Sequence, residues 1–208
     1  MSEQSVLIVF AKAPVAGQVK TRLIPELGLK QSLYVYERML SRTVRLAKKS
    51  DFNSVKLFID GNIRHSYFNS VKKRYGIRLY PQKGHDLGRR MFNAFQSVLN
   101  KYKYAVLIGS DCPGIVVNDL RTSLSLLKQD NDIVLGPAND GGYYLVGLKK
   151  NNDKLFNNIQ WSTESVANET YRIVKELNWK LSKLPVHTDI DNSRDLRAYS
   201  KKLNNFRP

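Results

Sequence analysis

Three cations and a glycine lie in one short loop that follows the first apolar segment of the chain. The loop, residues 11–22, reads Ala-Lys-Ala-Pro-Val-Ala-Gly-Gln-Val-Lys-Thr-Arg. Backbone N–H groups beside glycine and small residues, together with point charges, can hold a pyrophosphate. The loop is not of the Walker A type, because two residues separate Gly17 from Lys20-Thr21. A solvated basic loop is the alternative. The candidate nucleotide-binding residues of this loop are Ala11, Lys12, Gly17, Lys20 and Arg22.

Acidic residues that could hold a divalent cation occur at two places. Asp111 lies in 109–113, Gly-Ser-Asp-Cys-Pro, after an apolar segment, and a carboxylate at a strand end can hold Mg²⁺ beside a phosphate. Asp189 and Asp191 would face the same side of an extended segment and could share that cation. In each case the alternative is a carboxylate that caps a helix or turn. Because a neighbouring carboxylate raises a thiol pKa, we expect Cys112 to be buried rather than nucleophilic.

Two further segments place glycine beside polar residues. In 136–144, Gly-Pro-Ala-Asn-Asp-Gly-Gly-Tyr-Tyr, the adjacent glycines allow a ligand to approach the backbone, although a hairpin is the alternative. In 84–91, Gly-His-Asp-Leu-Gly-Arg-Arg-Met, Asp86 would cap a helix, and the helix start could also present N–H and guanidinium groups to an anion. Trp161 could add an apolar or stacking wall.

These segments connect apolar stretches that alternate with helical patterns. The predicted strands are 6–10, 55–59, 77–80, 104–108, 132–135 and 143–148. Helices are expected after Pro25, over 64–75, from Leu87 to Tyr102, over 166–177 and over 194–203. The alternation predicts an α/β fold of three layers, α/β/α, with a mostly parallel central sheet. In such sheets ligands bind beyond the carboxyl ends of the strands, where the loops above lie.

Length, cysteine content and charge narrow the class of protein. A chain of 208 residues fits one domain, 1–208, and its single cysteine excludes a disulfide framework and a cysteine-rich zinc site. The apolar segments are too short to span a bilayer and no secretion signal is apparent, so we expect a cytoplasmic location. The formal net charge of +16 is typical of proteins with polyanionic partners. Because the basic residues are spread along the chain, a phosphate-bearing substrate is favoured over nucleic acid.

Taken together and in order, these segments resemble the DUF2064 family of GT-A-like nucleotide-diphospho-sugar transferases, described as glycosyltransferases. The resemblance covers roughly residues 5–200 and is most specific in Asp140-Gly141-Gly142-Tyr143 and Ser110-Asp111-Cys112-Pro113. It implies a Rossmann-like GT-A fold and a nucleotide site that includes Asp86, Arg90 and Ser110 besides the first loop. It also implies a metal site of Asp111 with Asp189 or Asp191. The acceptor side would comprise Asp140, Gly141, Gly142, Tyr143 and Trp161.

The first functional hypothesis is a transferase that requires Mg²⁺ or Mn²⁺ and moves a sugar from a nucleotide-diphospho-sugar to a small acceptor. The metal and Lys20 would neutralise the leaving diphosphate, and Asp140 would position or deprotonate the acceptor. Two departures from the family pattern stand out. Gly114 and Asn139 are uncharged where many members are acidic, and Asp111 stands alone where GT-A enzymes carry Asp-x-Asp.

The single Asp111 keeps two alternatives open. The first is a nucleotidyltransferase that uses an NTP and releases pyrophosphate, as in the small enzymes of molybdenum-cofactor and F420 biosynthesis. The second is a non-catalytic nucleic-acid-binding protein.

Overall fold

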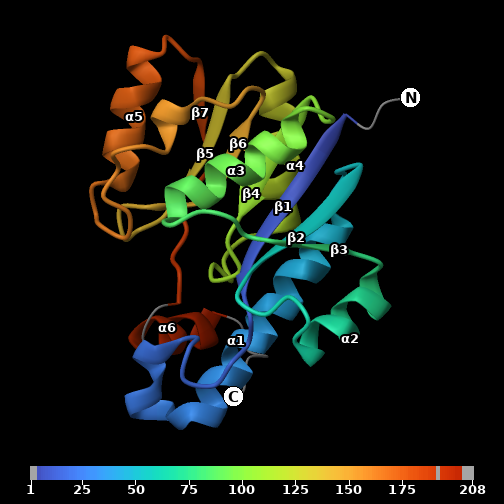
Figure 1. Ribbon diagram of the computed structural model, residues 1–208. Helices are drawn as coiled ribbons and strands as arrows, with labels where there is room; N and C mark the ends of the chain where they lie inside the picture. Colours follow the sequence, from blue (N-terminus) through green and yellow to red (C-terminus); the bar gives the residue numbers. More distant parts are fainter. Residues whose placement is uncertain (1–3, 191–192, 203–208) are drawn as a thin grey trace.

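A computed structural model describes residues 4–190 and 193–202. Its strands are β1 (Ser5–Lys12), β2 (Ser54–Asp60), β3 (Arg78–Pro81), β4 (Tyr104–Ile108), β5 (Ile133–Pro137), β6 (Tyr143–Leu148) and β7 (Leu181–Lys183). They form one sheet in the order β3-β2-β1-β4-β6-β5-β7 (Figure 1). Every neighbouring pair is parallel except those of β6, which runs antiparallel to β4 and β5.

Helices cover both faces of the sheet, as the sequence predicts. One core cluster joins the sheet to α1 (Ile24–Lys49), α2 (Ser66–Tyr75) and α4 (Val117–Lys128). A second joins its other face to α3 (Leu87–Leu99) and α5 (Val166–Glu176). Short 3-10 turns, η1 (Thr21–Leu23) and η2 (Asp153–Leu155), complete the connections. The three-layer α/β/α architecture is therefore confirmed.

The central strand β1 shows why its sequence is apolar throughout. Leu7 and Val9 belong to the cluster that contains α1, whereas Val6 and Ile8 belong to the cluster that contains α3. All four side chains are fully buried. A strand that lies between two helical layers must be apolar on both faces, which gives a continuous run instead of an alternating one.

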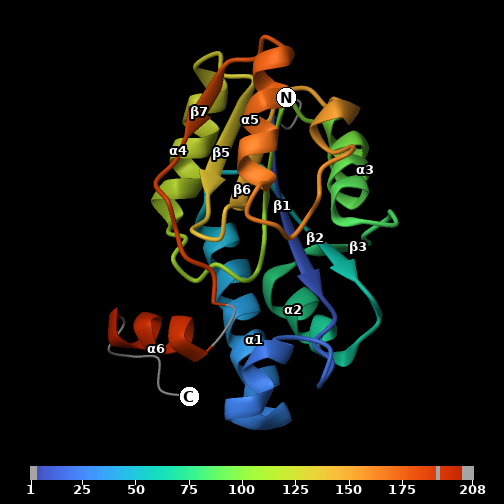
Figure 2. The same ribbon diagram turned by 90° about the vertical axis from the view of Figure 1, so that its left-hand side faces the viewer.

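A third small cluster places the last helix below the sheet. In it, α6 (Ser193–Lys202) packs through Leu196 and Tyr199 against Leu23, Met39 and Ile190. Figures 1 and 2 show α6 and the first part of α1 beyond the carboxyl ends of the strands. No helix in the described ranges is long and apolar enough to cross a membrane.

Several elements differ from the expectation. The sequence interpretation did not predict α4 or the three-residue strand β7, and the observed α3 ends at Leu99 rather than at Tyr102. The helix expected after Pro25 begins at Ile24, with Pro25 in its first turn, and it is interrupted at Gly28, where φ is 75°. The helix expected over 64–75 begins at Ser66, because His65 Nδ1 caps it by accepting from the Tyr67 N–H.

The order of the strands in the sheet indicates where a ligand is expected to bind. From β1 the chain moves outward through β2 to β3, and then returns to the other side of β1 as β4. Such a reversal leaves a crevice between the carboxyl ends of β1 and β4, which is where open α/β sheets bind ligands.

Candidate functional site

A cleft of about 710 Å³ opens at the carboxyl ends of β1 and β4. It is also lined by the loop after β1, by the end of β2, by the start of α3 and by the loops around β6. The structure brings ten of the predicted site residues to its wall. They are Ala11, Lys12, Lys20, Arg22, Arg90, Ser110, Asp111, Asp140, Tyr143 and Asp189.

Lys20 is the buried cation of this cleft. Its ammonium lies 3.3 Å from Asp111 Oδ2 and donates to the Ile190 carbonyl at 2.5 Å. The side chain is only 4% exposed. Its backbone is left-handed, with φ 48° and ψ 42°, a strained conformation for a long side chain. The backbone is therefore strained at the residue whose ammonium lies beside Asp111, the carboxylate that follows β4.

Asp189 is the carboxylate with the most perturbed environment in the cleft. Burial raises its pKa to about 6; Asp111 and Asp140 add to the rise, whereas Lys20 and the hydrogen bond with Cys112 oppose it. Its Oδ1 is buried without a hydrogen-bond partner. A buried carboxylate oxygen of this kind is suited to a proton or a cation.

Cys112 is buried, as expected. Its pKa is raised above the ordinary range, first by burial and then by Asp189. The sequence argument assigned this electrostatic effect to the adjacent Asp111. The folded chain provides it through a residue far away in the sequence.

Three further polar side chains shape the cleft, and sequence reasoning missed them. The Tyr36 hydroxyl accepts from the Lys12 N–H at 2.7 Å and donates to the Lys12 carbonyl at 2.9 Å. Burial, and then Asp111, raises the pKa of Tyr36 above its ordinary range, so this phenol stays protonated. Gln82 Nε2 donates to the Ala11 and Phe58 carbonyls at 3.2 and 3.0 Å. Together they fix the end of β1.

The third missed residue is Asp60, which ends β2. Its Oδ2 lies 2.7 Å from Arg90 Nη1, so the guanidinium expected to contact nucleotide is held by a carboxylate at the rim. Asp60 and Gln82 both follow predicted strands, which is a signal that could have identified them. Tyr36 has none, since it lies within a long amphipathic helix.

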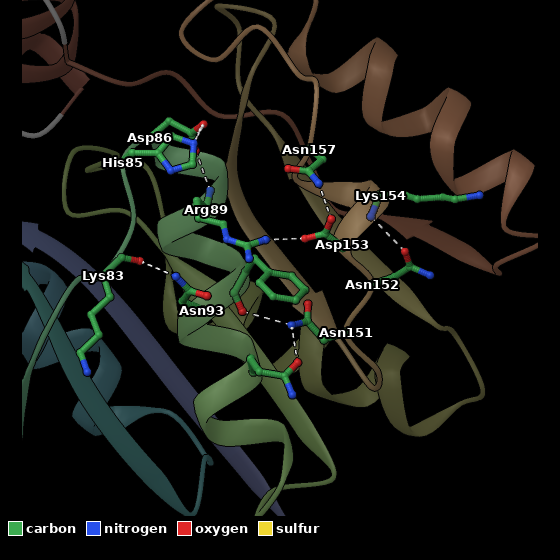
Figure 3. A network of polar contacts seen from close by, with 12 residues as sticks. Lys83, His85, Asp86, Arg89, Asn93, Asn151, Asn152, Asp153, Lys154 and Asn157 are labelled. Carbon is green, nitrogen blue, oxygen red and sulfur yellow. Dashed lines mark hydrogen bonds and ion pairs between the residues drawn. The ribbon is translucent and has the colours of Figure 1, made fainter.

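The motif around Asp86 serves mainly to build α3 (Figure 3). Asp86 Oδ1 accepts from the Arg89 N–H at 2.6 Å and caps the helix. The Arg89 guanidinium lies 2.6 Å from Asp153, whose other oxygen accepts from Asn157. Asp86 is therefore a helix cap beside the cleft, and it does not line the cleft wall.

Four other predicted residues also lie off the cleft wall: Gly17, Gly141, Gly142 and Trp161. Gly141 has φ 84°, and a Cβ there would lie within 2.6 Å of the Glu164 carbonyl carbon. The glycine thus allows two loops to interlock, and the Ala167 N–H donates to its carbonyl at 2.9 Å. Trp161 packs edge-on against Tyr143, with ring centroids 6.4 Å apart. Tyr143 lines the cleft, but its hydroxyl bonds to Thr170 of α5.

The predicted metal ligands are partly assembled. Asp111 and Asp189 lie in the same cleft, whereas Asp191 falls outside the described residues. Within residues 4–190 and 193–202, no group of three or more His, Cys, Asp or Glu side chains is arranged to hold a metal ion. Two carboxylates are the most that the described chain offers here.

The strand order and the cleft define the fold of nucleotide-diphospho-sugar transferases and nucleotidyltransferases. A candidate nucleotide-diphospho-sugar transferase from Desulfovibrio desulfuricans G20 matches with a TM-score of 0.89 and 28% identity, over 99% of this chain and 90% of that one. Rv0371c from Mycobacterium tuberculosis H37Rv, complexed with manganese, matches at 0.61 and 16%, over 96% and 100%. The inositol-1-phosphate CTP transferase from T. maritima matches at 0.63 and 13%, over 98% and 96%. These neighbours are transferases or share their fold.

Residues 43–163 match the model of a family described as an uncharacterized protein conserved in bacteria (DUF2064). The chain therefore belongs to the DUF2064 family, which confirms the resemblance seen in the sequence. No curated protein matches it.

Proposed function

We propose that the chain is a transferase that uses Mg²⁺ or Mn²⁺ and moves a sugar from a nucleotide-diphospho-sugar to a small acceptor. The observation that carries this proposal is the meeting of opposite charges in one cleft. Lys12, Lys20 and Arg22 come from β1 and the segment after it. Asp111, Asp140 and Asp189 come from the segments that follow β4, β5 and β7. The first set suits a diphosphate, and Asp111 and Asp189 of the second set suit a divalent cation.

The carboxylates fit a divalent cation. Asp189 Oδ1 is buried without a partner, and Asp111 Oδ2 already faces an ammonium. Magnesium is commonly held by one or two carboxylates together with substrate phosphates, so Asp111 and Asp189 suffice from this part of the chain. Such an ion neutralises charge on a leaving diphosphate. The manganese complex of a protein with this fold supports the assignment.

The other residues position the substrates. Lys20 and Arg22 would bring fixed positive charge to the diphosphate, where negative charge builds up during transfer. Tyr36 and Gln82 hold the β1 terminus that carries Lys12. Asp140 Oδ1 accepts from the Gly142 N–H at 2.9 Å, which orients its carboxylate to position an acceptor or to take its proton.

Nucleotidyl transfer is the second candidate. It is favoured by the single carboxylate between Ser110 and Cys112, and by the likeness of the fold to the T. maritima CTP transferase. Both functions use the same cleft. They differ in the bond that breaks, which the donor identifies: a nucleotide-sugar for the first, an NTP for the second.

Thermal unfolding with nucleotide-sugars and NTPs, each with and without Mg²⁺ or Mn²⁺, tests both. A ligand at about 100 times its Kd stabilises by about 2.7 kcal/mol, which raises the Tm of a chain of this size by about 5–10 °C. We expect a metal-dependent rise with one nucleotide-sugar. Asp111→Asn should abolish it. Asp51→Asn, which removes an exposed carboxylate paired with Arg121, should retain it.

The donors separate the outcomes. A rise confined to an NTP would replace sugar transfer by nucleotidyl transfer. A wild-type Tm that no nucleotide changes, with either metal, would contradict both proposals.

A further inference from the structure

One face of the sheet is left open at the β3 edge. On the side that α3 and α5 cover, α3 packs over the centre of the sheet, and Figure 1 shows no helix in front of β2 and β3. Lys56, Phe58, Arg78 and Tyr80 share this face, because Lys56 pairs with Arg78 and Phe58 with Tyr80 in the parallel register.

The side chains on this open face form a compact group of hydrogen-bond donors. The Tyr80 ring stacks on Phe58, with centroids 5.1 Å apart and planes 21° from parallel. Lys56 Nζ lies 4.7 Å from the Tyr80 centroid and donates to its hydroxyl at 3.1 Å. The Arg78 guanidinium hydrogen-bonds the same hydroxyl. An ammonium, a guanidinium and a phenol therefore converge beside a partly exposed ring, an arrangement that suits a phosphate.

The segment of the chain that contains this group is strongly basic. Residues 54–83 contain seven Lys and Arg residues and a single acidic residue, Asp60, which pairs with Arg90. This segment therefore supplies +6 of the net +16 in 30 of 208 residues. Lys83 follows β3 on the α3 side, where Asn93 Nδ2 of α3 donates to its carbonyl at 2.9 Å.

The opposite edge of the sheet provides an internal comparison. There Lys149, Lys150 and Lys180 all pair with Asp130 or Asp132, at 2.7 to 3.9 Å. Among the described residues, Lys56, Arg78 and Lys83 have no carboxylate partner. The lysines of that edge are thus paired within the chain, whereas the cations of the open face remain available to a phosphate.

We propose that the open face of β2 and β3, with Lys83 just after β3, binds the phosphates of a single-stranded nucleic acid. Stacked aromatic rings flanked by cations are the usual means of holding single strands, since phosphates meet the cations and bases meet the ring. A duplex would present only its phosphates to this two-stranded surface, so we expect it to bind more weakly than a single strand. The site lies on the side of the sheet away from α1, and it uses none of the acidic residues of the cleft.

Fluorescence anisotropy with labelled single-stranded DNA and RNA of about 12 nucleotides tests this proposal. The test variant is Lys56→Gln/Arg78→Gln/Lys83→Gln. The matched control is Lys149→Gln/Lys150→Gln/Lys180→Gln, which removes the same charge from the other edge. We expect the test variant to bind at least tenfold more weakly and the control to change less than threefold. The slope of log affinity against log salt should flatten by about 2, since each phosphate contact on a single strand contributes about 0.7.

Four results would overturn the proposal. They are no binding at about 50 mM salt, an equal loss in both triple variants, equal affinity for a duplex of the same length, and loss of oligonucleotide binding in Asp111→Asn. If no binding is seen at low salt, the cations would instead prevent the exposed edge strand from pairing with another chain. The last would place the oligonucleotide in the cleft.

Discussion

Asp189 makes the stability of the protein depend on pH in a predictable direction. Its folded pKa of about 6 lies above the ordinary value of 3.8. Between these two pH values the folded state holds a proton that the unfolded state has released, so the free energy of unfolding falls as pH rises. The loss is about 1–3 kcal/mol by pH 7. Urea unfolding in EDTA at pH 4.5 and pH 7 measures it.

Asp189→Asn provides the comparison for this measurement. It keeps the shape of the side chain and removes the proton, so the difference in stability between the two pH values should shrink by about the same 1–3 kcal/mol. Because the effect belongs to the ionised form, the variant should also be the more stable protein at pH 7. A variant with the full pH dependence of the wild type would show that other groups cause it.

Sequence could identify some cleft residues because they follow recognisable strands. Asp111 comes after the apolar run of β4, and Lys12 ends β1. Asp86 shows the limit of this reasoning, since a cap and a ligand contact have the same sequence signature and only the fold separates them. Tyr36 shows another limit. Its role depends on the Lys12 backbone, 24 positions earlier, which no local pattern indicates.

At the scale of elements, the interlocked loops before β6 and before α5 are held by Gly141. An alanine there would need a left-handed backbone and would also overlap Glu164. We expect Gly141→Ala to lower the free energy of unfolding by about 2–5 kcal/mol, from strain and overpacking together.

Gly76 provides the control. Its φ is 61° and no atom lies near its Cβ direction, so an alanine there measures the cost of the backbone conformation alone. Gly76→Ala should cost about 1–2 kcal/mol. Equal costs in urea unfolding would show that the overlap relaxes freely.

The sequence predicts whether a segment is a helix or a strand better than it predicts the direction of a strand in the sheet. The strand β6 is buried and apolar like the parallel strands of the sheet, and nothing in its periodicity shows that it runs antiparallel to β4 and β5. The strand β7 has only three residues, too few for any pattern. Its pairing with β5 is nevertheless important, because the segment that follows it carries Asp189 to the cleft.

For the whole molecule, sequence gives the total charge but not its distribution. Lys149-Lys150 and Lys72-Lys73 are equivalent dipeptides in the sequence. Folding brings the first beside Asp130 and Asp132, and leaves the second without carboxylate partners in the described chain. The spread of basic residues that argued against a nucleic-acid partner is therefore a property of the sequence alone, and the fold concentrates part of it.

The two helical layers share one sheet, so we predict that residues 1–208 unfold as a single domain. Trp161 and Trp179 both lie on the α3 and α5 face, whereas Val44 of α1 is fully buried on the other. Because β1 contributes side chains to both faces, neither layer can leave the sheet alone.

In urea, tryptophan fluorescence and far-UV circular dichroism should give one midpoint. Val44→Ala should destabilise by about 2 kcal/mol and shift both probes equally, although no tryptophan is near it. Arg45→Ala, exposed on the same helix, should shift neither. A circular dichroism midpoint that moves while the fluorescence midpoint stays would mean that the faces unfold separately.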